Sequence, residues 1–307
     1  MWEADKIIYK DEGDFIAAYI GENLMWKITS ENGIKIYIKS IEDGTTPNWN
    51  GQTLTLGWNT LDLTSLEYTY FYPHLSSIKN AVIGEVSFDG FSYDKLERIT
   101  NFLWNDSMRR FIDVDKLSLV NCDLTNITTL MFSTSNTTNE VLNIGTIEGN
   151  LYLPNCTSLS NCFYNLQCPN FNLSVIEAPT LRNCQYMFAN AQIEKAPQII
   201  GSNIAIITNM FDGSSVKEIP IMDCTNVTST TSSFRNCTEL TTVGGFIGLK
   251  IGISFNKSPL TLESVKNIAN TIGEGSGSAI GFSQYTDNLL TDELRALFTN
   301  KGWVITA

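Results

Sequence analysis

The sequence Met187-Phe188-Ala189-Asn190 has three counterparts along the chain, and their spacing decides the fold. The counterparts read CFYN, MFDG and SFRN, and each contains one phenylalanine. Successive phenylalanines are separated by about 25, 23 and 23 residues, a period typical of proteins built from stacked repeats. We therefore expect a buried structural spine made of Phe163, Phe188, Phe211 and Phe234.

A second match follows each phenylalanine by five residues. Residues 193–197 read IEKAP, and residues 216–220 read VKEIP. If these segments are neighbouring strands, Glu194 lies opposite Lys217 and Lys195 lies opposite Glu218, and opposite charges across neighbouring strands attract. The alignment predicts an inter-repeat ladder of Glu194, Lys195, Lys217 and Glu218. Phe132 belongs to an earlier, irregular copy.

The first third of the chain does not share the repeat. Residues 15–27 (FIAAYIGENLMWK) read as strand, turn and strand, and residues 34–38 (IKIYI) alternate as a strand does. Residues 94–105 have the apolar spacing of a helix. An aromatic cluster lies between them, and such clusters dominate interface energetics. We expect an attachment or oligomerisation domain over residues 1–105, with a candidate assembly interface at Tyr68, Tyr70, Phe71 and Tyr72.

The last fifty residues predict a cap. Thr261 is a good helix N-cap, and Leu262, Val265, Ile268 and Ile272 form an apolar stripe behind it. A second helix begins near residue 291, with Leu294, Leu297 and Phe298 facing inward, and residues 303–305 read as a closing strand. This pattern predicts repeats over residues 106–258 and a helical cap over residues 259–307.

The seven cysteines all lie between Cys122 and Cys237. Their number is odd, and the C-x-x-C pairs typical of structural zinc are absent. Small buried positions in the repeats explain them best, while a metal site and a disulfide or redox role stay open as alternatives.

Composition and motifs exclude several functions. The net charge of −12 argues against a sequence-independent nucleic-acid binder, and no apolar run is long enough for membrane insertion. The N-terminal sequence lacks the pattern of a secretory signal. His74 is the one histidine, and no nucleophile elbow, phosphate loop or dinucleotide fingerprint appears. We expect no enzyme, no catalytic residue, no cofactor and no metal.

The segments MFANAQI (187–193) and FRNCTEL (234–240) resemble the repeats of BspA-like leucine-rich-repeat proteins. The C-terminal segments 260–272 and 289–305 resemble the closing region of such proteins, many of which are encoded by gut bacteria and their bacteriophages. Residues 19–27 are similar to a strand-turn-strand of phage structural proteins. The resemblance implies a leucine-rich-repeat solenoid used in surface adhesion or recognition. The expected fold class is therefore α+β and β-rich: a leucine-rich-repeat-like solenoid with an N-terminal β-rich domain and a C-terminal helical cap.

The expected function is that of a bacteriophage virion structural protein, made in the host cytoplasm. As a fibre, baseplate or capsid-decorating appendage, it would present its repeats for attachment to the host surface. A bacterial cell-surface adhesin is the alternative, and a virion-associated polysaccharide depolymerase is a third hypothesis. The expected partners are other virion proteins, further copies of this chain, and a host-surface glycan or protein. Polar side chains suited to hydrogen bonding predict a ligand face at Gln198, Asn236, Thr241 and Thr242.

Overall fold

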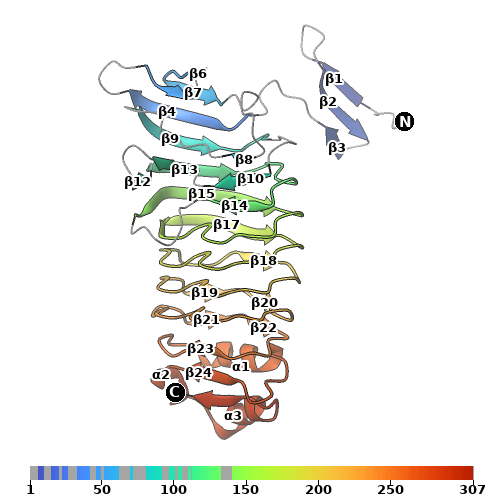
Figure 1. Ribbon diagram of the computed structural model, residues 1–307, viewed down its shortest axis with the longest axis vertical. Coiled ribbons are helices and arrows are strands. Elements are labelled where there is room, and N and C mark those ends of the chain that lie inside the picture. Colours follow the sequence, from blue (N-terminus) through green and yellow to red (C-terminus); the bar gives the residue numbers. More distant parts are fainter. Residues whose placement is uncertain are drawn as a thin grey trace.

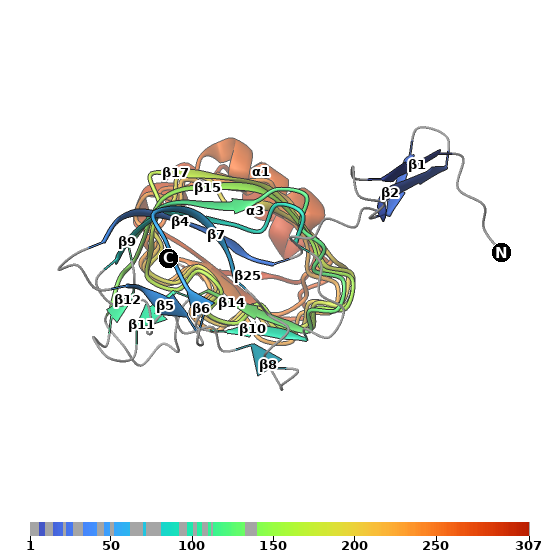
Figure 2. The same cartoon turned by 90° about the horizontal axis from the view of Figure 1, so that it is seen from above.

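Short strands stack one above another along the long axis of the molecule (Figure 1). The computed structural model describes residues 6–9, 15–20, 23–26, 33–41, 46–49, 52–61, 70–71, 81–91, 97–100, 103–105, 110–111, 113–132 and 140–306. Viewed along the stack, β15 (Leu142–Tyr152) and β17 (Asn170–Glu177) overlie each other on one side, and β10 (Arg98–Thr100) and β14 (Thr129–Met131) lie on another (Figure 2). A single hydrophobic cluster, running from Ile34 to Trp303, fills the space inside.

The largest sheet in the described residues has eight strands. In spatial order it contains β18 (Gln198–Ile200), β17, β15, β13 (Val114–Leu119), β9 (Ala81–Ser87), β4 (Lys35–Ile41) and β7 (Gly57–Thr60), and β16 (Leu166–Gln167) also pairs with β15. The sheet is mixed, because β4 is antiparallel to both its neighbours whereas β9, β13, β15, β17 and β18 are parallel. The predicted boundary after residue 105 therefore falls within one sheet, between β9 and β13.

The predicted fold class, an α+β leucine-rich-repeat-like solenoid with a helical cap, is wrong. The chain is β-rich around its mixed sheet. Helix is confined, in the described residues, to α1 (Leu262–Thr271), α2 (Gln284–Asp287) and α3 (Asp292–Thr299). The segment before each phenylalanine, which leucine-rich repeats often fold as a helical turn, is a tight turn here.

Backbone conformation explains why these segments are not helical. The residues two before and two after each phenylalanine have φ between 53° and 70°; they are Asn161 and Asn165, Tyr186 and Asn190, Asn209 and Gly213, and Ser232 and Asn236. Left-handed residues interrupt a right-handed helix, and Asn and Gly adopt this conformation more readily than other residues. The phenylalanine N–H then donates to the next repeat, from Phe188 to the Met210 carbonyl at 2.8 Å and from Phe211 to the Ser233 carbonyl at 2.9 Å.

The helix predicted over residues 94–105 is also wrong where the structure describes it. Arg98–Thr100 forms β10, which pairs in parallel with β14 and with β8 (Tyr70–Phe71). Ile99 and Leu103 are buried, as the helical stripe required, but Ile99 lies in strand β10 and Leu103 in a turn. Tertiary strand pairing has overridden the local helical preference.

The C-terminal end is closed by a sheet, so the predicted helical cap is not supported. Strands β23 (Ile253–Phe255), β24 (Ala279–Phe282) and β25 (Val304–Thr306) pair in parallel and continue the stack, with the short helices beside them (Figure 1). Thr261 does cap α1, accepting a hydrogen bond from the Ser264 N–H at 3.2 Å. Leu262 and Leu297, predicted to face inward, are exposed, whereas Val265, Ile268, Leu294 and Phe298 of the same helices are buried.

Five further small sheets complete the described structure. The strands not yet named are β1 (Lys6–Tyr9), β2 (Phe15–Ile20) and β3 (Asn23–Trp26), which form an antiparallel sheet, and β5 (Asn48–Trp49), β6 (Gln52–Thr53), β11 (Trp104–Asn105), β12 (Arg110–Phe111), β19 (Glu218–Ile219), β20 (Met222–Asp223), β21 (Thr242–Val243) and β22 (Phe246–Ile247). Strands β2 and β3, which pair in antiparallel, are the two strands predicted within residues 15–27.

Candidate functional site

The outer side of the eight-stranded sheet carries two rows of polar and aromatic side chains. In β4, Ile36 and Ile38 are buried, so the alternating Lys35 and Tyr37 point outward. Strand register then aligns one outward residue from each neighbouring strand. The first row is Trp58, Tyr37, Glu85, Lys116, Thr146 and Asn170, and the second is Thr60, Lys35, Ser87, Ser118, Glu148 and Asn172. We call these two rows the polar sheet face.

Two aromatic rings lie at one end of the polar sheet face. Trp58 is 52% exposed and Tyr37 is 38% exposed, and their ring centroids are 5.4 Å apart in an edge-on arrangement. The turn before Trp58 is held by Asn59, whose Oδ1 accepts from the Thr55 N–H at 2.8 Å and whose Nδ2 donates to the Thr55 carbonyl at 2.7 Å. A large aromatic surface is therefore presented to solvent from an ordered turn and strand.

Charges in the middle of the face are paired with each other. Lys116 Nζ lies 2.8 Å from Glu148 Oε1 and 3.4 Å from Glu85 Oε1. The hydrogen bond with Glu148 is the main reason that the pKa of Lys116 is raised, with the charge of Glu85 adding to it. Here the face encloses a shallow hollow of about 570 Å³, which Trp58 also lines. The hollow combines an aromatic wall, carboxylates and hydroxyl groups.

The predicted charge ladder lies at the other end of this face. Lys195 Nζ is 2.5 Å from Glu218 Oε1, and Lys217 Nζ is 3.1 Å from Glu194 Oε1. These residues line a second hollow of about 390 Å³ together with Asn170, Asn172, Thr241 and Thr242. Asn170 and Asn172 line this hollow and are also the last residues of the two rows, so the hollow continues the polar sheet face along the stack.

The four predicted ligand residues do not form one site. Thr241 and Thr242 line the ladder hollow. Gln198 instead donates from Nε2 to the Ile221 carbonyl at 2.7 Å, linking two repeats. Asn236 occupies a left-handed turn position, with φ of 60°. Similar polarity in the sequence did not mean a shared surface.

The predicted assembly interface cannot be placed. Tyr70 and Phe71 form β8, but their side chains, like Tyr68 and Tyr72, lie outside the described residues. The residues that sequence reasoning missed are those of the polar sheet face. The alternation of residues 34–38 was enough to predict that Tyr37 points outward. The sequence near Tyr37 does not indicate which strands pair with it, and this pairing places it beside Trp58 and Glu85.

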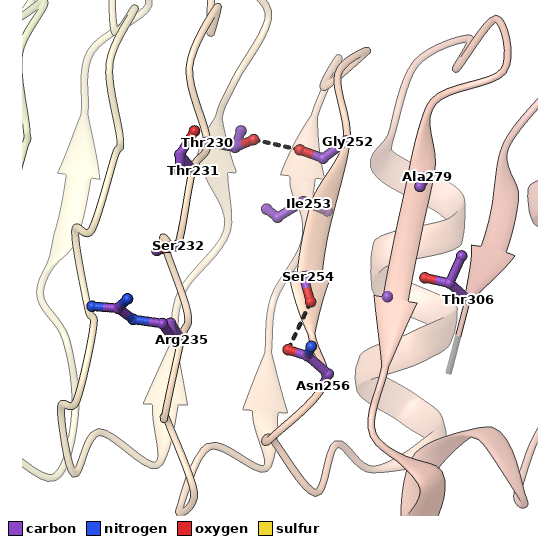
Figure 3. Close-up of a pocket in the computed structure, with 11 residues that line it drawn as sticks. Thr230, Thr231, Ser232, Arg235, Gly252, Ile253, Ser254, Asn256, Ala279 and Thr306 are labelled. Carbon is purple, nitrogen blue, oxygen red and sulfur yellow. Dashed lines mark hydrogen bonds between the residues drawn. The ribbon is translucent and has the colours of Figure 1, made fainter.

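Another hollow, of about 450 Å³, lies beside the C-terminal strands (Figure 3). Its floor includes Gly252, Ala279 and Gly281, whose small size leaves the space open. Several of its polar groups are engaged within the protein: the Thr230 hydroxyl donates to the Gly252 carbonyl, Ser254 Oγ donates to Asn256 Oδ1 at 2.8 Å, and Arg235 pairs with Asp212. No aromatic side chain lines it. The polar sheet face is therefore the stronger candidate.

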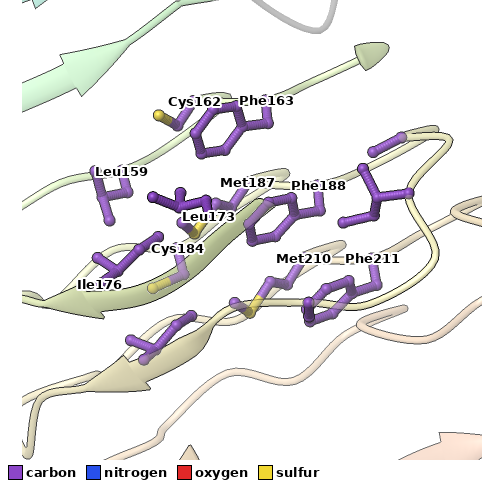
Figure 4. Close-up of a cluster of buried hydrophobic side chains, with 14 of the residues drawn as sticks. Leu159, Cys162, Phe163, Leu173, Ile176, Cys184, Met187, Phe188, Met210 and Phe211 are labelled. Atoms are coloured by element: carbon purple, nitrogen blue, oxygen red, sulfur yellow. The ribbon is translucent and has the colours of Figure 1, made fainter. Parts of the chain in front are cut away.

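The four predicted spine residues form one buried column, and Figure 4 shows Phe163, Phe188 and Phe211 of it. Ring centroids are 5.3 Å apart from Phe163 to Phe188, 5.4 Å from Phe188 to Phe211, and 5.6 Å from Phe211 to Phe234, with planes within 12° of parallel. The column extends to Phe132 at one end and to Phe255 and Phe282 at the other. Full burial gives these rings a structural role and no access to a ligand.

The cysteines beside this column offer no reactive thiol. All seven are free, and all but the partly exposed Cys122 are buried. Burial raises the pKa of Cys156 and Cys168 to about 11 and that of Cys237 to about 12, so these thiols stay protonated near neutral pH. In the described part of the chain, no group of His, Cys, Asp and Glu side chains has the arrangement of a metal site.

No family model, curated protein or solved structure matches this chain. Among the described residues, no helix has the length and apolarity needed to cross a membrane.

Proposed function

We propose that this protein is a non-enzymatic attachment protein and that its polar sheet face binds a surface glycan. The observation that carries the proposal is the exposed pair of Trp58 and Tyr37 at the end of two polar rows. A sugar ring has an apolar face of C–H groups and a rim of hydroxyls. An exposed indole matches the first, and neighbouring carboxylates, amides and hydroxyls match the second.

The paired charges favour binding over hydrolysis. A glycosidase needs two carboxyl groups that flank the scissile bond. Here Lys116 Nζ lies between Glu85 and Glu148, within 3.4 Å of each carboxylate. The ammonium group thus occupies the position that a scissile bond would need, which weighs against the depolymerase hypothesis.

The proposed setting is a bacteriophage particle, as the resemblance to BspA-like proteins implies. The protein would be made in the host cytoplasm and act as a fibre, baseplate or capsid-decorating appendage. Other virion proteins and further copies of this chain would be its assembly partners, and a host-surface glycan its ligand. A bacterial cell-surface adhesin would use the same face in the same way and remains the alternative.

Binding to a panel of purified bacterial polysaccharides, measured with the wild type and Trp58→Ala, tests the proposal. Loss of the indole should weaken binding at least tenfold. Tyr285→Ala is the matched control, because Tyr285 is 61% exposed but lies on α2, away from the polar sheet face. Equal losses in both variants, or none in Trp58→Ala, would contradict the proposed site.

Two further measurements separate the alternatives. Antibodies raised against the chain should label purified phage particles; labelling of uninfected bacterial surfaces would favour the adhesin. Incubation of a bound polysaccharide with the protein should release no new reducing ends, and their release would restore the depolymerase hypothesis.

A further inference from the structure

We propose that the ligand of the polar sheet face is an uncharged glycan whose chain runs along the stack, across the strands. This inference rests on the proposed function and specifies its ligand. Two independent features carry it: the charge state of the face and the direction in which its side chains are aligned.

The charges of the face do not suit an anionic polymer. Lys39, Lys116, Lys195 and Lys217 are each bonded to at least one carboxylate, at distances of 2.5 to 3.4 Å. Lys35 also has an interaction partner. A uronic-acid or phosphate polymer would have to displace these carboxylates, and it would approach a chain of net charge −12.

Nucleic acid is disfavoured for the same reason. Single-stranded nucleic acid also stacks on exposed aromatic rings, but it needs a groove of positive charge that follows its phosphates. Here Lys116, Lys195 and Lys217 form ion pairs with neighbouring carboxylates. The ligand that fits the aromatic pair and the paired charges is therefore polar, hydroxylated and uncharged.

The direction follows from strand register. Trp58, Glu85, Lys116, Thr146 and Asn170 lie in one row, and each comes from a different strand. Neighbouring strands are about 4.8 Å apart, so the five steps from β7 to β17 span about 24 Å. A polymer packed on Trp58 can reach Asn170 only by crossing the strands. The ladder hollow, which shares Asn170, extends the same path.

The experiment compares neutral and anionic polymers as probes. A soluble β-glucan, a mannan and an N-acetylglucosamine oligomer series represent the first class; hyaluronan and polygalacturonate represent the second. We expect a member of the neutral class to bind, with a Kd that changes less than about twofold when salt rises from about 50 to about 500 mM, because unpaired charges are not being screened. Binding of the anionic class alone, with a steep loss of affinity in salt, would overturn the inference and leave the attachment function standing.

Oligosaccharide length tests the direction. Affinity should rise with length until the oligomer spans about 24 Å. Asn170→Ala should weaken the long oligomers at least threefold and leave the shortest unchanged, while Trp58→Ala weakens all of them. Thr146→Ala, one strand before Asn170 in the row, is a second variant should Asn170→Ala fold poorly, and circular dichroism checks both. An equal loss of affinity at every length, or no loss at any length, in these far-end variants would overturn the proposed path. Failure of every probe in both classes to bind would overturn the proposed function together with this inference.

Discussion

Truncation of Phe188 to alanine should lower the free energy of unfolding by about 5 kcal/mol, the upper end of the range of roughly 3–5 kcal/mol for a buried phenylalanine. The side chain is fully buried between two parallel rings, with centroids 5.3 Å and 5.4 Å away, and contacts the edge of Phe171 at 6.1 Å. Each aromatic pair contributes about 0.5–1.5 kcal/mol beyond area burial. All three contacts are lost in the variant.

The cavity left behind cannot easily close. Phe163 N–H donates to the Met187 carbonyl, and Phe188 N–H to the Met210 carbonyl, both at 2.8 Å. These backbone bonds hold the repeats at their spacing, so Phe163 and Phe211 cannot move together to fill the gap. A cavity that cannot collapse gives the larger cost.

Equilibrium urea unfolding of the wild type and Phe188→Ala measures the loss. Because repeat proteins can depart from two-state unfolding, hydrogen exchange at the amides of Asn190 and Gly213 should show faster opening of the two repeats around the cavity. Phe188→Leu, which keeps part of the volume, should lose less than half as much. Tyr285→Ala should stay within about 0.5 kcal/mol of the wild type. A loss below about 1 kcal/mol in Phe188→Ala, far under the expected range, would refute the reasoning.

Three other outcomes are expected. Asn209 has φ of 53°, so Asn209→Val should lower the unfolding free energy by about 1–2 kcal/mol while Asn209→Gly stays near the wild type, as urea unfolding would measure. Burial raises the pKa of Cys156 from 9.0 to about 11, so alkylation of this thiol should be slow at pH 8. The stability contributed by the buried, protonated thiol is complete below pH 9 and is lost as pH rises toward 11, so the free energy of unfolding should fall between these pH values. The Lys217–Glu194 pair has side chains 51% and 80% exposed, so a double-mutant cycle should give a coupling below about 1 kcal/mol that shrinks in salt.

Sequence reasoning worked best where the repeats stack in parallel register. In such a stack each residue faces its equivalent in the next repeat, so the 23-residue period was enough to align Phe188 with Phe211 and Lys195 with Glu218. The residue type two positions after each phenylalanine, Asn in three repeats and Gly213 in the fourth, also follows from physics. That position is left-handed in every repeat, and Asn190 additionally donates from Nδ2 to Asn165 Oδ1 at 2.9 Å.

Sequence reasoning failed where a local pattern fitted more than one structure. Ile99 and Leu103 would share one face in a helix, yet Ile99 is buried from a strand, because β8 and β14 pair with β10 on either side, and Leu103 is buried from a turn. The tight turns before the phenylalanines depend on hydrogen bonds to the next repeat, such as the bond from the Phe188 N–H to the Met210 carbonyl, and no local pattern predicts these bonds.

The amino-acid sequence by itself determined the repeat period, the buried phenylalanine column and the pairing of charges between repeats, since all three depend on equivalent positions a constant number of residues apart. Only the tertiary structure decided that β4 and β9 join β13 in one mixed sheet, and that Trp58, Tyr37, Glu85 and Lys116 share one face. The physical reason is that hydrogen bonds between strands join backbone groups whatever the side chains are. The identities of the outward residues of β4, β7, β9 and β13 therefore do not indicate which strand lies beside each of them, and only the packing of the whole chain determines it.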